Sequence, residues 1–421
     1  MINRRELVRA LERRRVSDWV VIERTQELAI ADEARGLERR ERRTRTTVIV
    51  HQDVPTGRGS ARLELAAQEG SAADLVEQAL ALASAAVAPS WKSVAPAAPA
   101  RVAVADEVLA KADLAEAAAA TLRSLRRPAD VQVSAAIEVL REQVAMESSG
   151  GAGARWTATH LHADALVTTS DRSLALSRDA RRSMDLGLDS AVAAAAADLA
   201  RLASAGAPVP GRCALVLTAD AMLHDESLGV WSAFAAQADA ARERQGLTRY
   251  RLGAPIAPGA ERADEPLGIA SNGALDYATR SAPVGDEGDA VRRFPLIERG
   301  VCAGLGLSAR EAARRGRDPN GGVRNLVVAP GTWDEAVPKT RTIEVHRLRA
   351  LAIDPYTGDA SLELALAIDH RGGAAIPFTG GTVYLDLVAA LARARRSAVL
   401  VRRGAYQGPA AVLIEDAELV G

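Results

Sequence analysis

Two alternating segments at 341–370 constrain the fold most strongly. "RTIEVHRLRALAI" and "ASLELALAIDH" alternate apolar and polar residues, and "DPYTGD" between them carries the proline and glycine of a tight turn. This pattern predicts an antiparallel β-hairpin. Elsewhere, strand-like and helix-like segments are mixed without the regular spacing of β-α-β units. The sequence therefore predicts an α+β fold with largely antiparallel sheets and flanking helices.

The first half of the chain begins with a capped helix and continues into strands. Asn3 can cap the first helix, and Ser71 with Asp74 opens the second. "DWVVIERTQELAIADEARGLERRERRTRTTVIVHQ" alternates only partly and carries many charges. It predicts three strands of a meander with a polar outer face, and "TGRGSARLEL" adds a turn and another strand. The expected helices cover 3–15, 71–88, 112–127 and 189–205, and further strands lie in 130–148 and 155–171.

The segment "GAPVPGR" predicts a boundary between two domains, 1–207 and 208–421. The second domain is expected to be mainly antiparallel β. It opens with a buried strand, "CALVLT", which leads directly into a helix expected over 218–240. Residues 248–290 are rich in Gly, Pro and charge and lack periodicity, which is typical of functional or mobile loops. We interpret them as a candidate cleft lining, with a surface insertion as the alternative.

Charge and cysteine content exclude several classes of protein. With 53 basic and 54 acidic residues, the net charge of −1 provides no field for binding nucleic acid or an anionic membrane. Cys213 and Cys302 are the only cysteines, which excludes a disulfide framework and a cysteine-rich zinc module. The N-terminus lacks the apolar core of a secretory signal, and no apolar run is long enough to span a bilayer. We expect a cytoplasmic protein that binds neither nucleic acid nor membrane.

Two histidine patterns are candidates for metal binding. His160 and His162 lie two residues apart on an expected strand, so both imidazoles face the same side. No third ligand is near them in sequence, and a solvated strand face is the alternative. On the helix expected over 218–240, His224 is followed by Asp225 and Glu226. A zinc peptidase helix needs two imidazoles one turn apart and a glutamate that activates water.

Only part of such a motif is present on this helix. Leu228 and Gly229 stand where a second histidine would follow His224, and Asp225 replaces the glutamate with a side chain one methylene shorter. One imidazole and one carboxylate hold zinc weakly, because a catalytic site offers three protein ligands. Two interpretations stay open at this point: the remnant of a metal site, and an ordinary histidine on a helix surface.

Several segments follow one another in a characteristic order. In the first half these are "GRGSARLELA", the helix "DLVEQALALAS" and "MESSGGAGARWTATHLHADALVTTSDRS". In the second half they are "VPGRCALVLTADAMLHDESLG", "SAPVGDEGDAVRRFPLIERGVCAGLGLSAREAARRG" and "RNLVVAPGTWD". In this order and at these spacings, nearly the whole chain resembles the TldD/PmbA family, also called the TldD/TldE peptidase family. The resemblance implies that family's two-domain fold.

The resembled family has two kinds of member. TldD-type chains carry a His-Glu-x-x-x-His helix and a cysteine near the C-terminus, which together bind zinc. TldE/PmbA-type chains share the fold without these ligands and pair with a TldD-type chain. Here the motif's first histidine falls on His224, its glutamate on Asp225 and its second histidine on Gly229, and "RARRSAVLVRRGAYQGP" holds no cysteine. The chain therefore resembles the TldE/PmbA type, with no cofactor of its own and zinc in the partner.

The resemblance implies a non-catalytic subunit of a cytoplasmic metallopeptidase complex that holds extended peptides. Its partner would be a TldD-like subunit in a heterodimer, or a second copy of the chain in a homodimer. No residue is assigned a catalytic role. Two alternatives stay open. One is a homodimeric peptide-binding scaffold without protease activity, and the other is a metal-dependent peptidase that combines His224 with His160, His162, His346 or His370.

Overall fold

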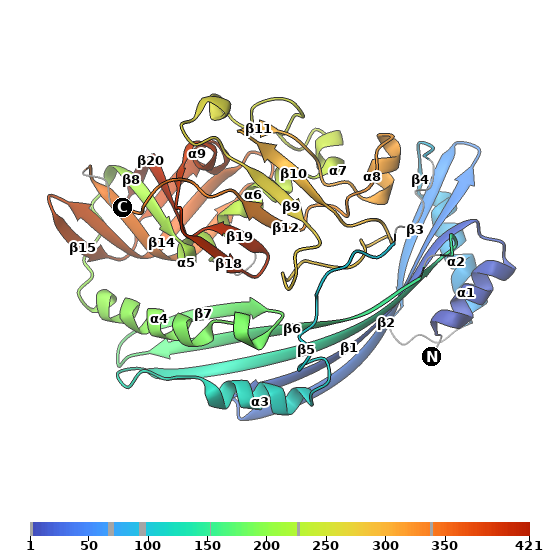
Figure 1. The fold of residues 1–421 in the computed structure, drawn as a ribbon, viewed down its shortest axis with the longest axis horizontal. Coiled ribbons are helices and arrows are strands. Elements are labelled where there is room, and N and C mark those ends of the chain that lie inside the picture. Colours follow the sequence, from blue (N-terminus) through green and yellow to red (C-terminus); the bar gives the residue numbers. More distant parts are fainter. Residues whose placement is uncertain (1–2, 66–70, 92–97, 152, 225–227, 337–339) are drawn as a thin grey trace.

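A long, curved antiparallel sheet dominates the N-terminal half of the protein (Figure 1). The computed structural model describes residues 3–65, 71–91, 98–151, 153–224, 228–336 and 340–421. The strand order in this sheet is β4-β3-β2-β1-β5-β6-β7. Its strands are β1 (Asp18–Asp32), β2 (Leu37–Val54), β3 (Gly57–Leu65), β4 (Val87–Ala88), β5 (Gln132–Ser148), β6 (Gly153–Thr168) and β7 (Ser173–Ala180).

The prediction of three strands at the start of the meander is wrong. Residues 18–54 form two long strands, β1 and β2, joined by a turn in which Gly36 has a φ of +56°. The two strands pair without interruption over the whole length of β1. No glycine or proline occurs in residues 37–52, so nothing ends the strand at its arginine-rich stretch.

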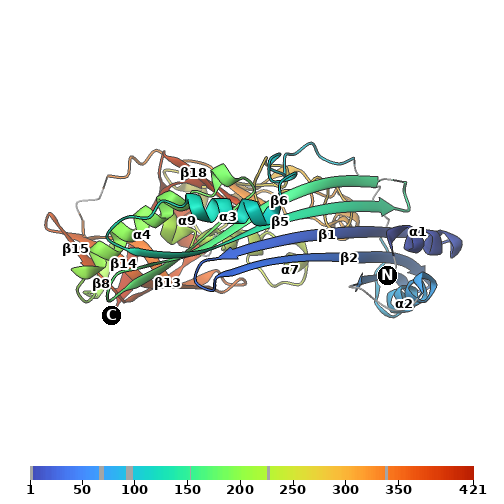
Figure 2. The same ribbon diagram turned by 90° about the horizontal axis from the view of Figure 1, so that it is seen from below.

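Four helices cover one face of this sheet, two toward each end (Figure 2). α1 and α2 pack on β1 and β2, whereas α3 and α4 pack on β5, β6 and β7. The predicted caps are confirmed, because Asn3 with Glu6 and Ser71 with Asp74 form capping boxes. The helices lie where the sequence predicts them, at α1 (Arg4–Arg13), α2 (Ala72–Ala85), α3 (Leu114–Ser124) and α4 (Leu188–Ala203).

The opposite face of the sheet meets the C-terminal half. Val284, from the long region 248–290, packs there against a small apolar cluster from β1, β2, β5 and β6. Arg181, directly after β7, is buried and ties the two halves together. Its guanidinium donates to the carbonyl oxygens of Ala278 at 2.9 Å and of Val104 at 3.1 Å. Residues from both halves therefore share the hydrogen bonds of one buried side chain.

Five strands close a small barrel in the C-terminal half. The circuit runs β13-β8-β20-β16-β14 and is closed by the pairing of β13 with β14, which confirms the predicted hairpin. β15 and β17 extend it. The strands are β8 (Gly211–Thr218), β13 (Thr342–Ile353), β14 (Asp359–Arg371), β15 (Ala374–Phe378), β16 (Thr382–Asp386), β17 (Arg395–Arg396) and β20 (Ala411–Val420).

A six-stranded sheet lies beside the barrel, in the order β11-β10-β9-β12-β19-β18. One large apolar core joins the two, from Leu215 on β8 to Leu326 on β12. No helix in the described part of the chain combines the length and hydrophobicity that a membrane span requires. The sheet and its neighbouring helices comprise β9 (Ile269–Asn272), β10 (Arg293–Glu298), β11 (Val301–Cys302), β12 (Asn325–Val328), β18 (Leu400–Arg403), β19 (Tyr406–Pro409), α8 (Ala309–Arg314) and α9 (Leu387–Arg393).

Candidate functional site

The segment after β8 does not form the continuous helix predicted for 218–240. α5 (Ala219–Met222) ends after one turn. Beyond 225–227, which lie outside the described residues, the chain continues as short helical pieces. These are a 3-10 turn (Gly229–Trp231), α6 (Ser232–Gln237) and α7 (Ala240–Arg244). The prediction is wrong because Gly229 has a φ of +50°, which an α-helix cannot accommodate.

Gly229 also lies against the backbone of α5. A Cβ atom at this position would stand 1.7 Å from the carbonyl oxygen of Met222 and 2.8 Å from the Cα of Leu223. Both separations are far inside van der Waals contact, and the left-handed φ disfavours any L side chain as well. Only glycine fits here. The backbone therefore leaves no room for an imidazole at the position where the motif's second histidine would stand.

His224 is exposed just beyond the end of α5. Asp225 and Glu226 follow it and lie outside the described residues. Over the ranges that the structure describes, no group of three or more His, Cys, Asp or Glu side chains could hold a metal ion. The role of His224 as a metal ligand stays a prediction.

His160 and His162 belong to a hydrogen-bonded cluster on β6 and β7. Asp179 Oδ1 lies 3.1 Å from His160 Nε2 and 2.9 Å from His162 Nδ1, and His162 Nε2 lies 3.1 Å from Asp164 Oδ2. The hydrogen bond to Asp179 raises the pKa of His162 to about 9. The imidazole is therefore protonated at neutral pH, and a protonated imidazole does not bind a metal. The protonated His162 on β6 therefore pairs with Asp179 on β7 and links the two strands.

A second cluster of the same kind lies on the barrel. Glu344 on β13 stands between His370 Nε2 at 2.8 Å and His346 Nε2 at 3.1 Å. The close contact with His346, followed by the hydrogen bond with His370, lowers the pKa of Glu344 to about 2. His346 also faces Asp198 of α4, with 3.7 Å between Nδ1 and Oδ1. The structure thus places the two histidine pairs on different sheets, each with its own carboxylate.

Both cysteines are buried in the C-terminal half. Burial raises the pKa of the Cys213 thiol to about 11 and also raises the pKa of Cys302. The thiolate is the form that binds zinc, so burial opposes a ligand role for either thiol. The chain between α9 and β20, where the resembled family's cysteine would lie, contains none.

Sequence reasoning missed Asp220, which organises the segment around α5. Its carboxylate pairs with Arg178 of β7 at 3.0 Å, with Arg347 of β13 at 3.0 Å and with Arg403 of β18. Burial alone would raise the pKa of Asp220, but the three arginines lower it. Arg347 also donates to Asp198 Oδ2 at 2.8 Å. The only sequence signal is an acid placed directly after a buried strand, because its partners are remote in the chain.

A cavity of the C-terminal half lies across the six-stranded sheet and measures about 600 Å³. Gly268, Ile269 and Ala270, all within the 248–290 region, contribute to its wall. Most of the lining is apolar. At one end stands Leu400 on the edge strand β18, with 50% of its surface exposed. The remaining lining residues are Arg293, Phe294, Pro295, Ile297, Glu298, Val327, Val328, Ala329, Pro330 and Gln407.

The "VGDEGD" stretch of the same region forms a tight loop against the N-terminal sheet. Asp289 is 5% exposed, and a Cβ at Gly285 would stand 2.2 Å from Asp289 Oδ1. A Cβ at Gly288 would lie 3.2 Å from the sulfur of Met146 on β5. Burial raises the pKa of Asp289 and of Glu287. Val284 and Gly288 of this loop thus contact the N-terminal sheet, and neither acid lines the cavity.

A family comparison covers the half of the chain that contains these features. Residues 210–421 match the sequence model of the PmbA/TldA metallopeptidase C-terminal domain. The chain belongs to the PmbA/TldD family. No curated protein has a significantly matching sequence.

Solved structures extend the PmbA/TldD likeness over the whole fold. A candidate modulator of DNA gyrase from Bacteroides thetaiotaomicron superposes with a TM-score of 0.77 at 14% identity, and the match covers 100% of both chains. A candidate modulator of a DNA gyrase from Thermotoga maritima gives 0.75 at 15% identity over 98% of both chains. TldE from Thermococcus kodakarensis gives 0.69 at 16% identity over 96% of both chains. At these identities the comparison establishes the fold alone.

The PmbA/TldD model is named for metallopeptidases, whereas this member of the family lacks room for one ligand of the zinc motif. Its α5 segment is nevertheless held in place by the ion pairs of the partly buried Asp220. The cavity on the six-stranded sheet is present as well. The described part of this chain thus has an apolar cavity on one sheet and an α5 segment whose backbone admits no side chain at position 229.

Proposed function

We propose that this chain is a non-catalytic, TldE-type subunit of a metallopeptidase complex. The observation that carries the proposal is the contact between Gly229 and Met222, which leaves no space for a second imidazole one turn after His224. A complete zinc site needs three protein ligands, and this backbone offers one of the motif's two histidines. Zinc, and the water it activates, would be supplied by a TldD-like partner.

The proposed task of the chain is to hold an extended peptide. The cavity across β9, β10, β12 and β19 is largely apolar, which suits the side chains of a peptide. β18 stands at the end of the sheet order, so its outer edge is available for backbone hydrogen bonds with an added strand. Such bonds tolerate many peptide sequences. Exposed Leu400 on β18 would contact the peptide where it leaves the cavity.

Metal analysis and a peptidase assay test this function. The purified chain is expected to contain no stoichiometric zinc and to cleave no peptide by itself. Mixed with a TldD-type chain that carries an intact His-Glu-x-x-x-His helix, it is expected to form a complex and to raise peptide cleavage. His160→Ala serves as a matched control for His224→Ala, since both remove one histidine.

Stoichiometric zinc that disappears in His224→Ala would contradict the proposal, and its persistence or loss in His160→Ala would show whether His160 is a second ligand. Such zinc would favour a metal-dependent peptidase acting alone. Failure to associate with any TldD-type chain, together with peptide binding by a homodimer, would favour a scaffold without protease activity. Each outcome is read from metal content, from size-exclusion chromatography with light scattering, and from release of a labelled peptide.

A further inference from the structure

An open trough crosses the outer face of the N-terminal sheet, between the helix pair α1 and α2 and the pair α3 and α4. Two adjoining cavities of about 670 and 700 Å³ form this trough and share Arg4 and Arg155. Two rows of residues that pair across β1, β5 and β6 make its floor. The first row is Thr25, Gln143 and Thr157, and the second is Glu23, Ala145 and Arg155.

Arg4 stands at the wall of the trough with its charge already compensated. Its guanidinium pairs with Glu147 of β5, and its backbone N–H donates to Glu23 Oε2 at 3.3 Å. These contacts fasten the first turn of α1 to the sheet. Arg4 therefore shapes the trough and is not free to bind a ligand.

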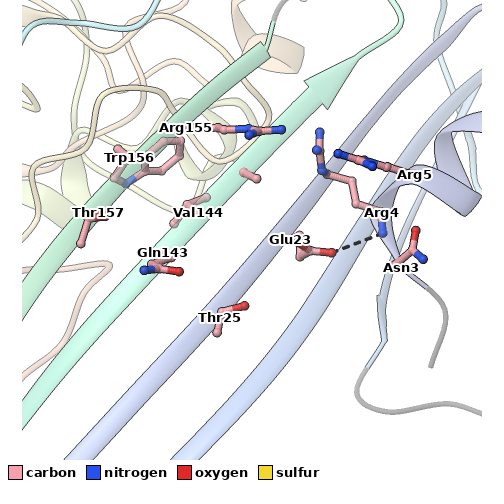
Figure 3. Close-up of a pocket in the computed structure, with 11 residues that line it drawn as sticks. Asn3, Arg4, Arg5, Glu23, Thr25, Gln143, Val144, Arg155, Trp156 and Thr157 are labelled. Atoms are coloured by element: carbon pink, nitrogen blue, oxygen red, sulfur yellow. Dashed lines mark hydrogen bonds between the residues drawn. The ribbon is translucent and has the colours of Figure 1, made fainter.

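Arg5 and Arg155 differ from Arg4 in having no such partner. Both side chains are exposed, and neither makes an ion pair or hydrogen bond within the described ranges of the chain. Figure 3 shows the guanidinium groups of Arg4, Arg5 and Arg155 extending toward one another at one end of the trough. The positive end of the ten-residue helix α1 lies at the same place. Two uncompensated positive charges thus converge there.

We propose that the trough binds an acidic peptide segment, with its carboxylates on Arg5 and Arg155. A guanidinium presents a planar fork that matches a carboxylate with two parallel hydrogen bonds. Gln143 and Thr157 lie on the floor, where their side chains can hydrogen-bond a peptide backbone. The trough lies on the other half of the molecule from the cavity proposed for extended peptides, and the two proposals are independent.

The size and charge of the trough favour a peptide over other anions. Its two cavities are many times larger than one small ion, so an isolated phosphate would leave most of the space to water. Glu12, Glu23 and Glu147 line the same space. They repel the closely spaced phosphates of a nucleic acid, and the net charge of −1 gives no compensating field. Carboxylates spaced along a peptide avoid these acids more readily.

Fluorescence anisotropy with a labelled eight-residue peptide of alternating Glu and Ser tests the proposal on the full chain. The double variant Arg5→Ala/Arg155→Ala is expected to weaken binding about tenfold or more, because two charge-assisted contacts are lost. Arg317→Ala/Arg393→Ala is the matched control, since it removes two exposed arginines of the C-terminal half, outside the trough. It is expected to change affinity by less than about twofold, as a distant screened charge should. Arg5→Lys/Arg155→Lys keeps the charge without the fork and should bind at an intermediate level.

Four outcomes would overturn the proposal. The first is no detectable binding of the Glu-Ser peptide by the wild-type chain, and the second is an equal loss of binding in the two double alanine variants. The third is tighter binding of single-stranded DNA of the same charge, which would assign the trough to nucleic acid. The fourth is full competition by inorganic phosphate at equal charge concentration, which would assign the trough to a small oxyanion. Thermal unfolding of each variant checks that the exposed substitutions leave the fold intact.

Discussion

The two halves of the chain use their sheets in different ways. In the C-terminal half, the barrel and the six-stranded sheet share one large core, and that core also takes in the segment after β8. In the N-terminal half, the apolar residues are divided among smaller clusters under separate helices, and the middle of the outer face stays open. The halves meet at Arg181, at the Val284 cluster and at the ion pairs of Asp198 and Asp220.

The two halves also place different demands on their sequences. The family sequence model covers residues 210–421, whereas the solved structures match over nearly the whole chain. A single interlocked core restricts which side chain fits at each position, because close packing makes every change in volume felt by its neighbours. A long sheet with an open polar face requires only alternation and register, which many sequences satisfy. The N-terminal sheet therefore restricts its sequence less than the C-terminal core does.

The largest expected effect comes from Gly229→His in the C-terminal half. The new side chain would overlap the Met222 carbonyl, so we expect a loss of more than about 4 kcal/mol in the free energy of unfolding, or no folded protein. Gly246→His is the control, because Gly246 also has a positive φ, of +73°, but open space around it. That variant should lose about 1 to 2 kcal/mol. Urea unfolding measures both, and zinc uptake by folded Gly229→His would contradict our account of the position.

The second test breaks the junction between the halves. Asp220→Asn leaves Arg178, Arg347 and Arg403 without their shared carboxylate, so we expect a loss of about 3 kcal/mol or more. Chemical unfolding should then show two separated transitions. The exposed acid Asp416 supplies the control, as Asp416→Asn removes only a surface pair with Arg212. Equal effects of the two substitutions would show that the Asp220 network does not hold the halves together.

A smaller change in the free energy of unfolding is expected when the pH is raised through the titration of His162 in the N-terminal half. Because Asp179 raises the pKa of His162 from 6.5 to about 9, the protonated imidazole stabilises the folded state below pH 6.5. This stabilisation is lost as the pH rises through about 9. With 31% of the His162 side chain exposed, we expect about 1 to 2 kcal/mol after screening by water. Thermal melts of wild type and His162→Gln between pH 6 and 10 measure it, and a wild-type curve with the same slope as the variant would disprove the assignment.

The smallest effect on stability is expected on the cavity rim. Leu400→Glu changes an exposed side chain and should leave the free energy of unfolding within about 0.5 kcal/mol of wild type. It should nevertheless weaken binding of a labelled valine-rich octapeptide about fivefold, since one apolar contact is replaced by a charge. Leu82→Glu on α2 is the matched control, with 45% exposure and no contact with the cavity. Equal binding by the two variants would place the peptide elsewhere.

Much of the secondary structure could be predicted from local patterns. Caps at Asn3 and Ser71 and the turn "DPYTGD" report on neighbouring residues, and the structure confirms the helices and the hairpin that they predict. The helix expected over 218–240 is wrong because two residues within the segment, Met222 and Gly229, come into contact, and Gly229 is left-handed there. The apolar pattern of the segment does not reveal that contact. Asp220 was missed for another reason, since its three arginines come from distant strands.

The sequence by itself determined the α+β class and the incomplete ligand set, because residue identity and periodicity act over a few positions. Only the tertiary structure decided that the position of the second histidine admits nothing but glycine. It also decided that four other histidines contact the carboxylates of Asp179 and Glu344. The cavity on the six-stranded sheet and the trough beside α1 likewise exist only once remote strands are paired. Such sites depend on the register of whole sheets, which the packing of the complete chain establishes.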